Sequence, residues 1–282
     1  MEIQSVGIIG CGLMGSGIAQ VAAASGFEIR VVEISDEFLE KGIGRIRKGL
    51  DRLVKKEKIT SEDADAVLSR IQGGTSVADL APCDLIIEAV TENLETKVAV
   101  FSQVREAARA DAIIGSNTSS LSITRLMTEV EDPTRFLGFH FFNPVPVMKL
   151  VEVVKTLATS QETLDSAFEF TRKLGKTPVL CEDRTGFLVN RLLIPYLLDA
   201  VRAWENGTGS KEDIDLAMKL GCGYPMGPFQ LIDFIGLDTI LHIAEIMYEE
   251  FKEARMAPPP TLKRLVMAGR LGRKSGAGFY EY

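Results

Sequence analysis

The sequence predicts an α/β protein that begins with a doubly wound, mostly parallel sheet and ends with an all-helical part. Two observations carry this prediction. Short β-branched runs alternate with helical stretches over residues 1–185, as in strand–helix–strand units. From Gly186 onward only helical stretches follow. Because 282 residues exceed what one hydrophobic core usually holds, we expect two domains, 1–185 and 186–282.

The first strand leads into a glycine-rich turn. The run SVGIIG is followed by GCGLMG, which fits the pattern G-x-G-x-x-G, and then by a helical stretch. Glycine suits such a turn because the backbone bends sharply, approaches a pyrophosphate and packs close to the helix. The motif alone is weak, since packing also explains such turns. In this context it predicts a Rossmann-type dinucleotide site at Gly10, Gly12, Leu13, Met14 and Gly15.

Glu33 completes the first strand–helix–strand unit. It lies at the end of FEIRVVEIS (27–35), near the offset of about 20 residues expected for a ribose-binding acid. A carboxylate at this place accepts hydrogen bonds from ribose hydroxyls and repels a 2′-phosphate. We therefore expect NAD rather than NADP as the cofactor. A solvated acid at a strand end is the alternative.

Two further strands continue the parallel pattern. They are DLIIEAV (84–90) and AIIGSN (112–117), with a helical stretch at 93–109 between them. Ligands of open α/β sheets bind at the carboxyl ends of the strands. We therefore expect chemistry at Glu92 and at residues 117–120.

A histidine and a glutamate occupy the next two strands, FLGFHFF (136–142) and KLVEVV (149–154). The prolines of the intervening NPVPVM forbid a helix and favour a hairpin or wide turn. If the turn centres on Pro146, His140 and Glu152 are cross-strand partners. Such a pair makes His140 a candidate general base, oriented by the carboxylate. The alternative is a core histidine without a catalytic role.

Ser119 and Asn190 carry neutral groups that can hold a substrate oxygen without titrating. Either residue can equally be a helix cap or a turn residue.

The helical part begins with FLVNRLLIPYLLDAVRAWENG and has wide apolar faces. One layer of helices buries such faces poorly, so we expect a homodimer through this domain. Packing against the sheet domain is the alternative. A helix is expected to start at Ser210 and to end at Gly221. His242 is expected to be a packing or surface residue.

Composition excludes several classes of function. The net charge of −7 disfavours binding to nucleic acid or to an anionic membrane, and no apolar run is long enough to span a bilayer. The four cysteines are widely spaced and have no histidine at ligand spacing, which predicts neither a metal site nor disulfides. The first residues enter a strand pattern at once, so we expect a cytoplasmic protein. Seven basic residues in 45–58 form a local patch suited to an anionic ligand.

The chain resembles the L-3-hydroxyacyl-CoA dehydrogenase family over almost its whole length, and its length is similar to that of the bacterial enzymes for 3-hydroxybutyryl-CoA. The resemblance is carried by GCGLMG, EAVTENLETK, SNTSSLSIT, GFHFFNPVPVMKLVEVV, GFLVNRLLIPY and LGCGYPMGPFQLIDFIGLD. It implies reversible hydride transfer between C3 of a 3-hydroxyacyl-CoA and NAD. His140 is similar to the family's catalytic base and Glu152 to its partner. Ser119 and Asn190 match its substrate-orienting residues, and Ser119 is expected to contact the cofactor and the CoA substrate.

The resemblance also implies how the cofactor and CoA are held. Glu33 binds the adenosine ribose, although the family more often has aspartate there. Lys56 matches the CoA contact, whereas a corresponding serine is Gly49 here; a solvated charged face is the alternative. The residues implied to contact the rest of the cofactor are Glu92, Lys97 and Asn143 on the nicotinamide side and Lys274 from the C-terminus.

Two other functions remain open on the sequence. One is a 3-hydroxyisobutyrate or 6-phosphogluconate type of dehydrogenase, but its G-x-x-G-x-G-x-x-x-K lysine motif is absent. The other is a protein of the same fold that binds NAD for structural or redox-sensing purposes.

Overall fold

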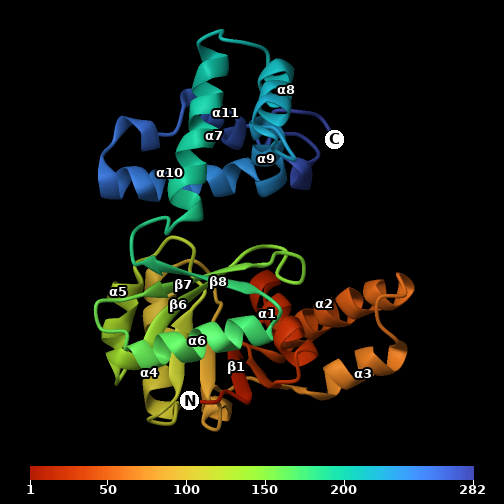
Figure 1. The fold of residues 1–282 in the computed structure, drawn as a ribbon, viewed down its shortest axis with the longest axis vertical. Coiled ribbons are helices and arrows are strands. Elements are labelled where there is room, and N and C mark those ends of the chain that lie inside the picture. Colours follow the sequence, from red (N-terminus) through yellow and green to blue (C-terminus); the bar gives the residue numbers. More distant parts are fainter. The chain divides into compact units, whose positions relative to one another are not determined.

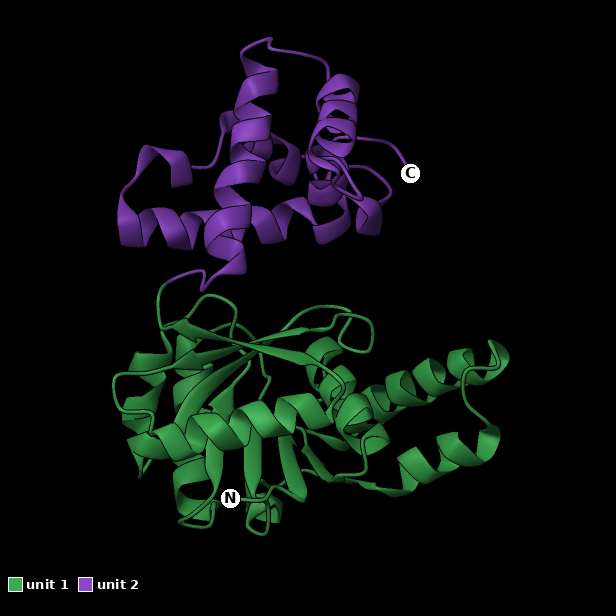
Figure 2. Cartoon of the chain, viewed as in Figure 1, with its two compact units in different colours: residues 1–184 green, residues 185–282 purple.

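The structure is a computed structural model and describes residues 1–282. Its contacts divide the chain into two compact units, Met1–Arg184 (unit 1) and Thr185–Tyr282 (unit 2), coloured separately in Figure 2. No helix in either unit combines the length and the apolar character that crossing a membrane requires.

Unit 1 is built on one eight-stranded sheet of order β3-β2-β1-β4-β5-β6-β7-β8 (Figure 1). Strands β1 to β6 are parallel, β7 runs antiparallel to β6, and β8 is parallel to β7. The bounds are β1 Ser5–Ile9, β2 Glu28–Val32, β3 Ile71–Gly74, β4 Leu85–Glu88, β5 Ile113–Ser116, β6 Phe136–Phe141, β7 Leu150–Lys155 and β8 Thr177–Glu182. This confirms the predicted doubly wound, mostly parallel sheet.

Helices cover both faces of this sheet (Figure 1). They are α1 Leu13–Ala24, α2 Asp36–Lys55, α3 Ser61–Ser69, α4 Leu94–Ala107, α5 Ile123–Leu126 and α6 Gln161–Lys173. Several begin at a polar residue whose side chain accepts a backbone N–H, for example Thr60 before α3 and Ser160 before α6. These caps satisfy donors that the first helical turn leaves unpaired.

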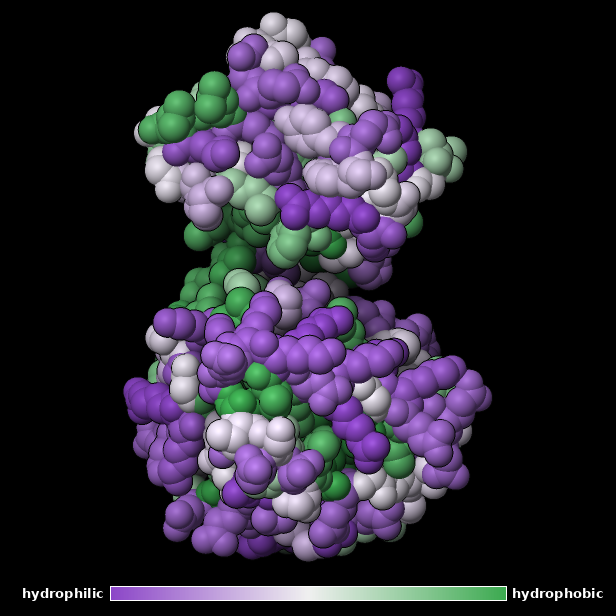
Figure 3. Space-filling view, turned by 90° about the vertical axis from the view of Figure 1, so that its right-hand side faces the viewer, coloured by the Kyte–Doolittle hydropathy of each residue, from purple (hydrophilic) through white to green (hydrophobic).

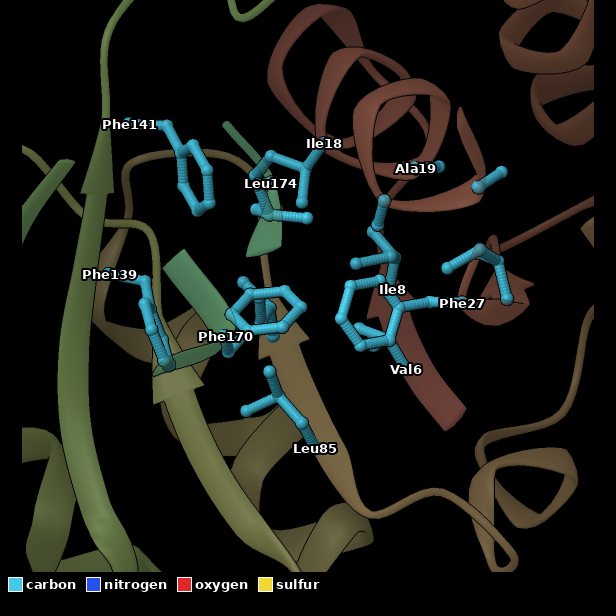
Figure 4. Packing of buried hydrophobic residues seen from close by; sticks show 14 of the residues in the cluster. Val6, Ile8, Ile18, Ala19, Phe27, Leu85, Phe139, Phe141, Phe170 and Leu174 are labelled. Carbon is cyan, nitrogen blue, oxygen red and sulfur yellow. The ribbon is translucent and has the colours of Figure 1, made fainter. Parts of the chain in front are cut away.

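Successive side chains of β6 point to opposite faces of the sheet, so one set joins the hydrophobic core and the other set includes His140. Phe139 and Phe141 point to the face that α1 and α6 cover, where they join the same hydrophobic cluster as Phe170 (Figure 4). The rings of Phe139 and Phe170 meet edge to face, with centroids 5.8 Å apart. Because side chains alternate along a strand, His140 points to the opposite face of the sheet. Phe136 shares that face and packs on Phe101 of α4.

Unit 2 is all helical, as predicted. Its helices are α7 Val189–Glu205, α8 Lys211–Cys222, α9 Pro228–Ile235, α10 Leu237–Phe251 and α11 Pro260–Met267. Its core contains Phe229 and Phe279, whose ring centroids lie 4.9 Å apart. Ser210 caps α8 as expected. The expected end at Gly221 is wrong, since α8 continues to Cys222 and Gly223 adopts the left-handed capping conformation with φ of 69°.

Candidate active site

His140 and Glu152 form a buried pair on neighbouring strands. They are direct partners in the antiparallel register of β6 and β7. His140 Nδ1 lies 2.6 Å from Glu152 Oε2, and both side chains are almost wholly hidden from solvent. Because an ionised carboxylate only accepts hydrogen bonds, Nδ1 carries the proton of this bond. Nε2 is then the ring nitrogen with a lone pair, which is the arrangement that a general base needs.

Phe142 packs on the ring of His140. The two ring centroids lie 4.5 Å apart with an interplanar angle of 53°. Residues two apart on an extended segment share a face. That spacing is a signal for this contact, although the sequence analysis assigned Phe142 no role.

A second polar group lies on the same face of the sheet, at the carboxyl ends of β4 and β5. Glu88 and Ser116 are register partners, and Ser116 donates to Glu88 Oε2 at 2.6 Å. Glu88 Oε1 accepts from Lys97 Nζ at 2.6 Å and from the Val90 N–H at 2.7 Å. Both carboxylate oxygens of this fully buried glutamate therefore have partners. Neither Glu88 nor Ser116 was predicted from the sequence to be a site residue.

Glu92 connects this group to the segment 118–120. Its Oε2 lies 3.5 Å from Lys97 Nζ. Its Oε1 accepts backbone and hydroxyl hydrogens from Thr118, Ser119 and Ser120 at 2.7 to 3.1 Å. Burial alone would raise the pKa of Glu92, but the Lys97 ammonium and these hydrogen bonds outweigh it and hold that pKa below its usual value.

Ser119 makes the longest of these contacts, 3.1 Å from its hydroxyl oxygen to Glu92 Oε1. Five donors converge on that one oxygen, more than its lone pairs can serve well. The Ser119 hydroxyl is consequently the group of this set that can turn most easily to another partner.

The turn between β6 and β7 is anchored by a buried lysine. Lys176 Nζ donates to the carbonyls of Val145 and Met148 at 2.6 and 2.7 Å. Burial lowers the pKa of this ammonium. Asn143 lies exposed at the start of the same turn.

The glycine-rich turn fits a dinucleotide. A Cβ at Gly15 would overlap the carbonyl oxygen of Gly10, so helix and strand approach too closely for any side chain there. A Cβ at Gly12 would meet no atom within 4 Å, which leaves open space where a pyrophosphate would lie. Glu33 accepts the N–H of Cys11 at 2.6 Å, so the ribose-binding candidate stands directly beside this turn. The residues present therefore fit NAD.

The other predicted residues lie elsewhere in the chain. Lys56 is exposed and follows the C-terminus of α2. Asn190 lies in the first turn of α7, in unit 2. Lys274, also in unit 2, is paired with Asp238 at 2.6 Å.

Comparison with known proteins identifies the family. The model of the 3-hydroxyacyl-CoA dehydrogenase NAD binding domain matches residues 5–184, and the model of the C-terminal domain of the same enzymes matches residues 186–282. The chain belongs to the 3-hydroxyacyl-CoA dehydrogenase family. The predicted resemblance, the enzyme class and NAD as the cofactor are thereby confirmed.

Relatives within this family are similar over nearly their full length. A probable 3-hydroxybutyryl-CoA dehydrogenase of Deinococcus radiodurans is 47% identical, with 98% of this chain and 99% of that protein covered. The human mitochondrial hydroxyacyl-coenzyme A dehydrogenase is also 47% identical, with coverage of 99% and 91%. The crystal structure of (S)-3-hydroxybutyryl-CoA dehydrogenase from Ralstonia eutropha matches with a TM-score of 0.96 and 45% identity, covering 100% of this chain and 99% of that one.

Proposed function

We propose that this family member is a 3-hydroxybutyryl-CoA dehydrogenase, which interconverts (S)-3-hydroxybutyryl-CoA and acetoacetyl-CoA. The observation that carries the proposal is the buried His140–Glu152 pair at 2.6 Å, in a chain of the 3-hydroxyacyl-CoA dehydrogenase family. The substrate is supported by two relatives, from Deinococcus radiodurans and Ralstonia eutropha, which carry that name and have a similar length.

In the oxidation direction His140 Nε2 takes the proton of the 3-hydroxyl group. When bound, NAD supplies the nicotinamide ring that accepts the hydride from C3. Glu152 holds Nδ1–H and stabilises the imidazolium that forms. In the reduction direction the same imidazolium returns its proton to the oxygen of the 3-oxo group. Because the pair is buried, its charge interaction is stronger than it would be in water.

Ser119 and Asn190 orient the substrate in this proposal. The Ser119 hydroxyl can turn from Glu92 to the substrate, since its hydrogen bond is the longest of five on one oxygen. The Asn190 amide offers a neutral donor and acceptor. Glu92 holds the backbone of 118–120 and, with Lys97 and Asn143, forms the nicotinamide side of the site.

Lys56 binds a phosphate of coenzyme A in this proposal. Its side chain is exposed and forms no ion pair, and it belongs to the basic stretch 45–58. Changing Lys56 to Glu is expected to raise KM for the CoA ester with little effect on kcat. An unchanged KM would show that Lys56 does not bind the coenzyme A phosphate and would favour a solvated charged face.

A homodimer through unit 2 is supported by apolar side chains at its surface. Leu192 of α7 and Leu220 of α8 are 75% and 76% exposed. Hydrophobic residues also reach the surface of this unit in Figure 3. Leu192→Glu is expected to yield monomers in sedimentation experiments.

The cytoplasmic location stays a prediction, since the human relative is mitochondrial.

The decisive experiment measures NADH oxidation with acetoacetyl-CoA by the wild type and by His140→Gln. Loss of the general base is expected to lower turnover by roughly 10²-fold or more, while NADH still binds. His242→Gln is the matched control, because His242 is the second of two histidines and lies on α10 of unit 2. Near-normal turnover in His140→Gln would reject the assignment.

Two further substrates separate the alternatives. Turnover of free acetoacetate in place of its CoA ester would favour another type of hydroxyacid dehydrogenase. NADH binding without turnover of any acyl-CoA would favour a structural or redox-sensing protein.

A further inference from the structure

Cys11, inside the glycine-rich turn, is held from three sides. Its N–H donates to Glu33 Oε1 at 2.6 Å, and its carbonyl accepts from Arg45 Nη1 at 3.2 Å. Its thiol packs directly against Gly42 of α2, where a Cβ would overlap the sulfur. A carboxylate at the end of β2 and a guanidinium from α2 therefore meet the backbone of the same residue.

The charges of Glu33 and Arg45 both act on Cys11. Burial, and to a smaller extent the Glu33 carboxylate, raise the pKa of the Cys11 thiol to about 12, against the opposing effect of Arg45. The second oxygen of Glu33 accepts the N–H of Ile34 at 3.0 Å, so backbone donors fix this carboxylate beside the turn. Arg45 has an exposed side chain and forms no salt bridge with a carboxylate.

From this geometry we propose that Arg45 is a second determinant of cofactor choice. Glu33 excludes a 2′-phosphate by charge repulsion, and Arg45 is the cation that binds that phosphate once the repulsion is removed. Guanidinium groups suit this task because they bind phosphate oxygens with two parallel hydrogen bonds. In the wild type the same guanidinium fixes the carbonyl of Cys11, so Arg45 positions the turn.

The test compares NADH and NADPH in four proteins: wild type, Glu33→Ser, Arg45→Gln and the double variant. This test rests on the proposed function, since the assay uses acetoacetyl-CoA as the substrate. Removing the opposing charge in Glu33→Ser is expected to raise kcat/KM for NADPH by roughly 10-fold or more. In Glu33→Ser/Arg45→Gln that gain is expected to disappear. A gain of activity cannot result from misfolding.

Arg70→Gln in the Glu33→Ser background is the matched control. Arg70 Nη1 also donates to a main-chain carbonyl, that of Ala23, but at the opposite end of α1 from the turn. This variant is expected to keep the NADPH gain. Arg45→Gln alone is expected to raise KM for NADH a few-fold through the loosened turn.

Two results would overturn the proposal. One is a Glu33→Ser protein without any gain for NADPH, and the other is a double variant that keeps the gain. If no protein reduces acetoacetyl-CoA, the proposed function fails instead. Binding of NADPH to the same four proteins, measured by nicotinamide fluorescence, then decides the role of Arg45. Tighter binding in Glu33→Ser that is lost in the double variant would support it.

Discussion

Lys97 and Glu88 form an ion pair that is hidden from solvent, with Nζ and Oε1 2.6 Å apart and side-chain exposures of 1% and 0%. A second carboxylate, that of Glu92, lies 3.5 Å from the same ammonium. One lysine therefore lies between two acids, and its single positive charge balances one of their two negative charges. Because Lys97 and Glu88 are hidden from water, whereas Glu92 is 26% exposed, the charges of Lys97 and Glu88 depend most strongly on each other.

Lys97→Met is therefore expected to lower the free energy of unfolding by about 3–5 kcal/mol, the usual cost of leaving a buried charge without its partner. Urea unfolding at pH 7 measures this. Lys41→Met is the control, because Lys41 pairs with Glu37 at the surface, where about 0–1 kcal/mol is expected. Equal losses in the two variants would contradict the buried-network interpretation.

The lowered pKa of Glu92 predicts how stability depends on pH. The folded-state pKa lies below the usual value of 4.5, so the unfolded state binds the proton more readily. The contribution of Glu92 to stability is complete above 4.5 and is lost as the pH falls from there through the folded-state pKa. Glu92→Gln lacks this contribution.

The unfolding free energy of Glu92→Gln is accordingly expected to fall less steeply than that of the wild type between pH values of about 5 and 3. Thermal or urea unfolding across this range measures the slope. Glu95→Gln, an exposed position in the first turn of α4, which begins two residues after Glu92, is expected to follow the wild type. Parallel curves for Glu92→Gln and the wild type would contradict the prediction.

The position of the His140–Glu152 pair was predictable because local rules determine it. Period-two alternation fixes the face of each residue, and a turn centred on Pro146 fixes which residues lie opposite each other. Glu88 had no such signal. It ends an apolar strand, and its partners Lys97 and Ser116 lie nine and 28 residues further along the chain. Only the packing of three elements brings them together.

Two strands of the sheet also depend on pairing between segments that are distant in the sequence. Neither β3 nor β8 was predicted from the sequence to be a strand. The side chains of β8 do not alternate clearly between buried and exposed, and both of its end residues, Thr177 and Glu182, are exposed. The strand is fixed instead by parallel pairing with β7, to which α6 connects it along the chain. The end of α8 was misplaced because two glycines compete, and only Gly223 has the left-handed conformation of a cap.

Phe142 is expected to support catalysis through its contact with His140. The face of an aromatic ring stabilises a nearby cation by about 0.5–2 kcal/mol, and in the proposed mechanism His140 becomes an imidazolium during oxidation. Phe142→Leu is therefore expected to lower kcat for 3-hydroxybutyryl-CoA by roughly 2- to 30-fold. Steady-state kinetics measures this, with KM for NAD as a check on cofactor binding. Phe168→Leu is the control, since that ring contacts Arg172 on α6.

Unchanged kcat in Phe142→Leu would show that the contact only fills space. An equal loss in Phe168→Leu would point to a general effect on folding, and unfolding curves of both variants distinguish that case.

Glu152→Gln tests the charge of the pair without changing its shape. The amide oxygen still accepts Nδ1–H, so the ring keeps its orientation, but a neutral group stabilises the imidazolium less. Turnover is expected to fall roughly 10²-fold, as other losses of acid–base catalysis do, while KM for NADH stays near the wild-type value. Glu182→Gln on β8 is the control, because Glu182 pairs with Lys155 at the surface. Turnover in Glu152→Gln as high as in Glu182→Gln would mean that the carboxylate only orients the ring and that its charge contributes nothing to the proton transfer.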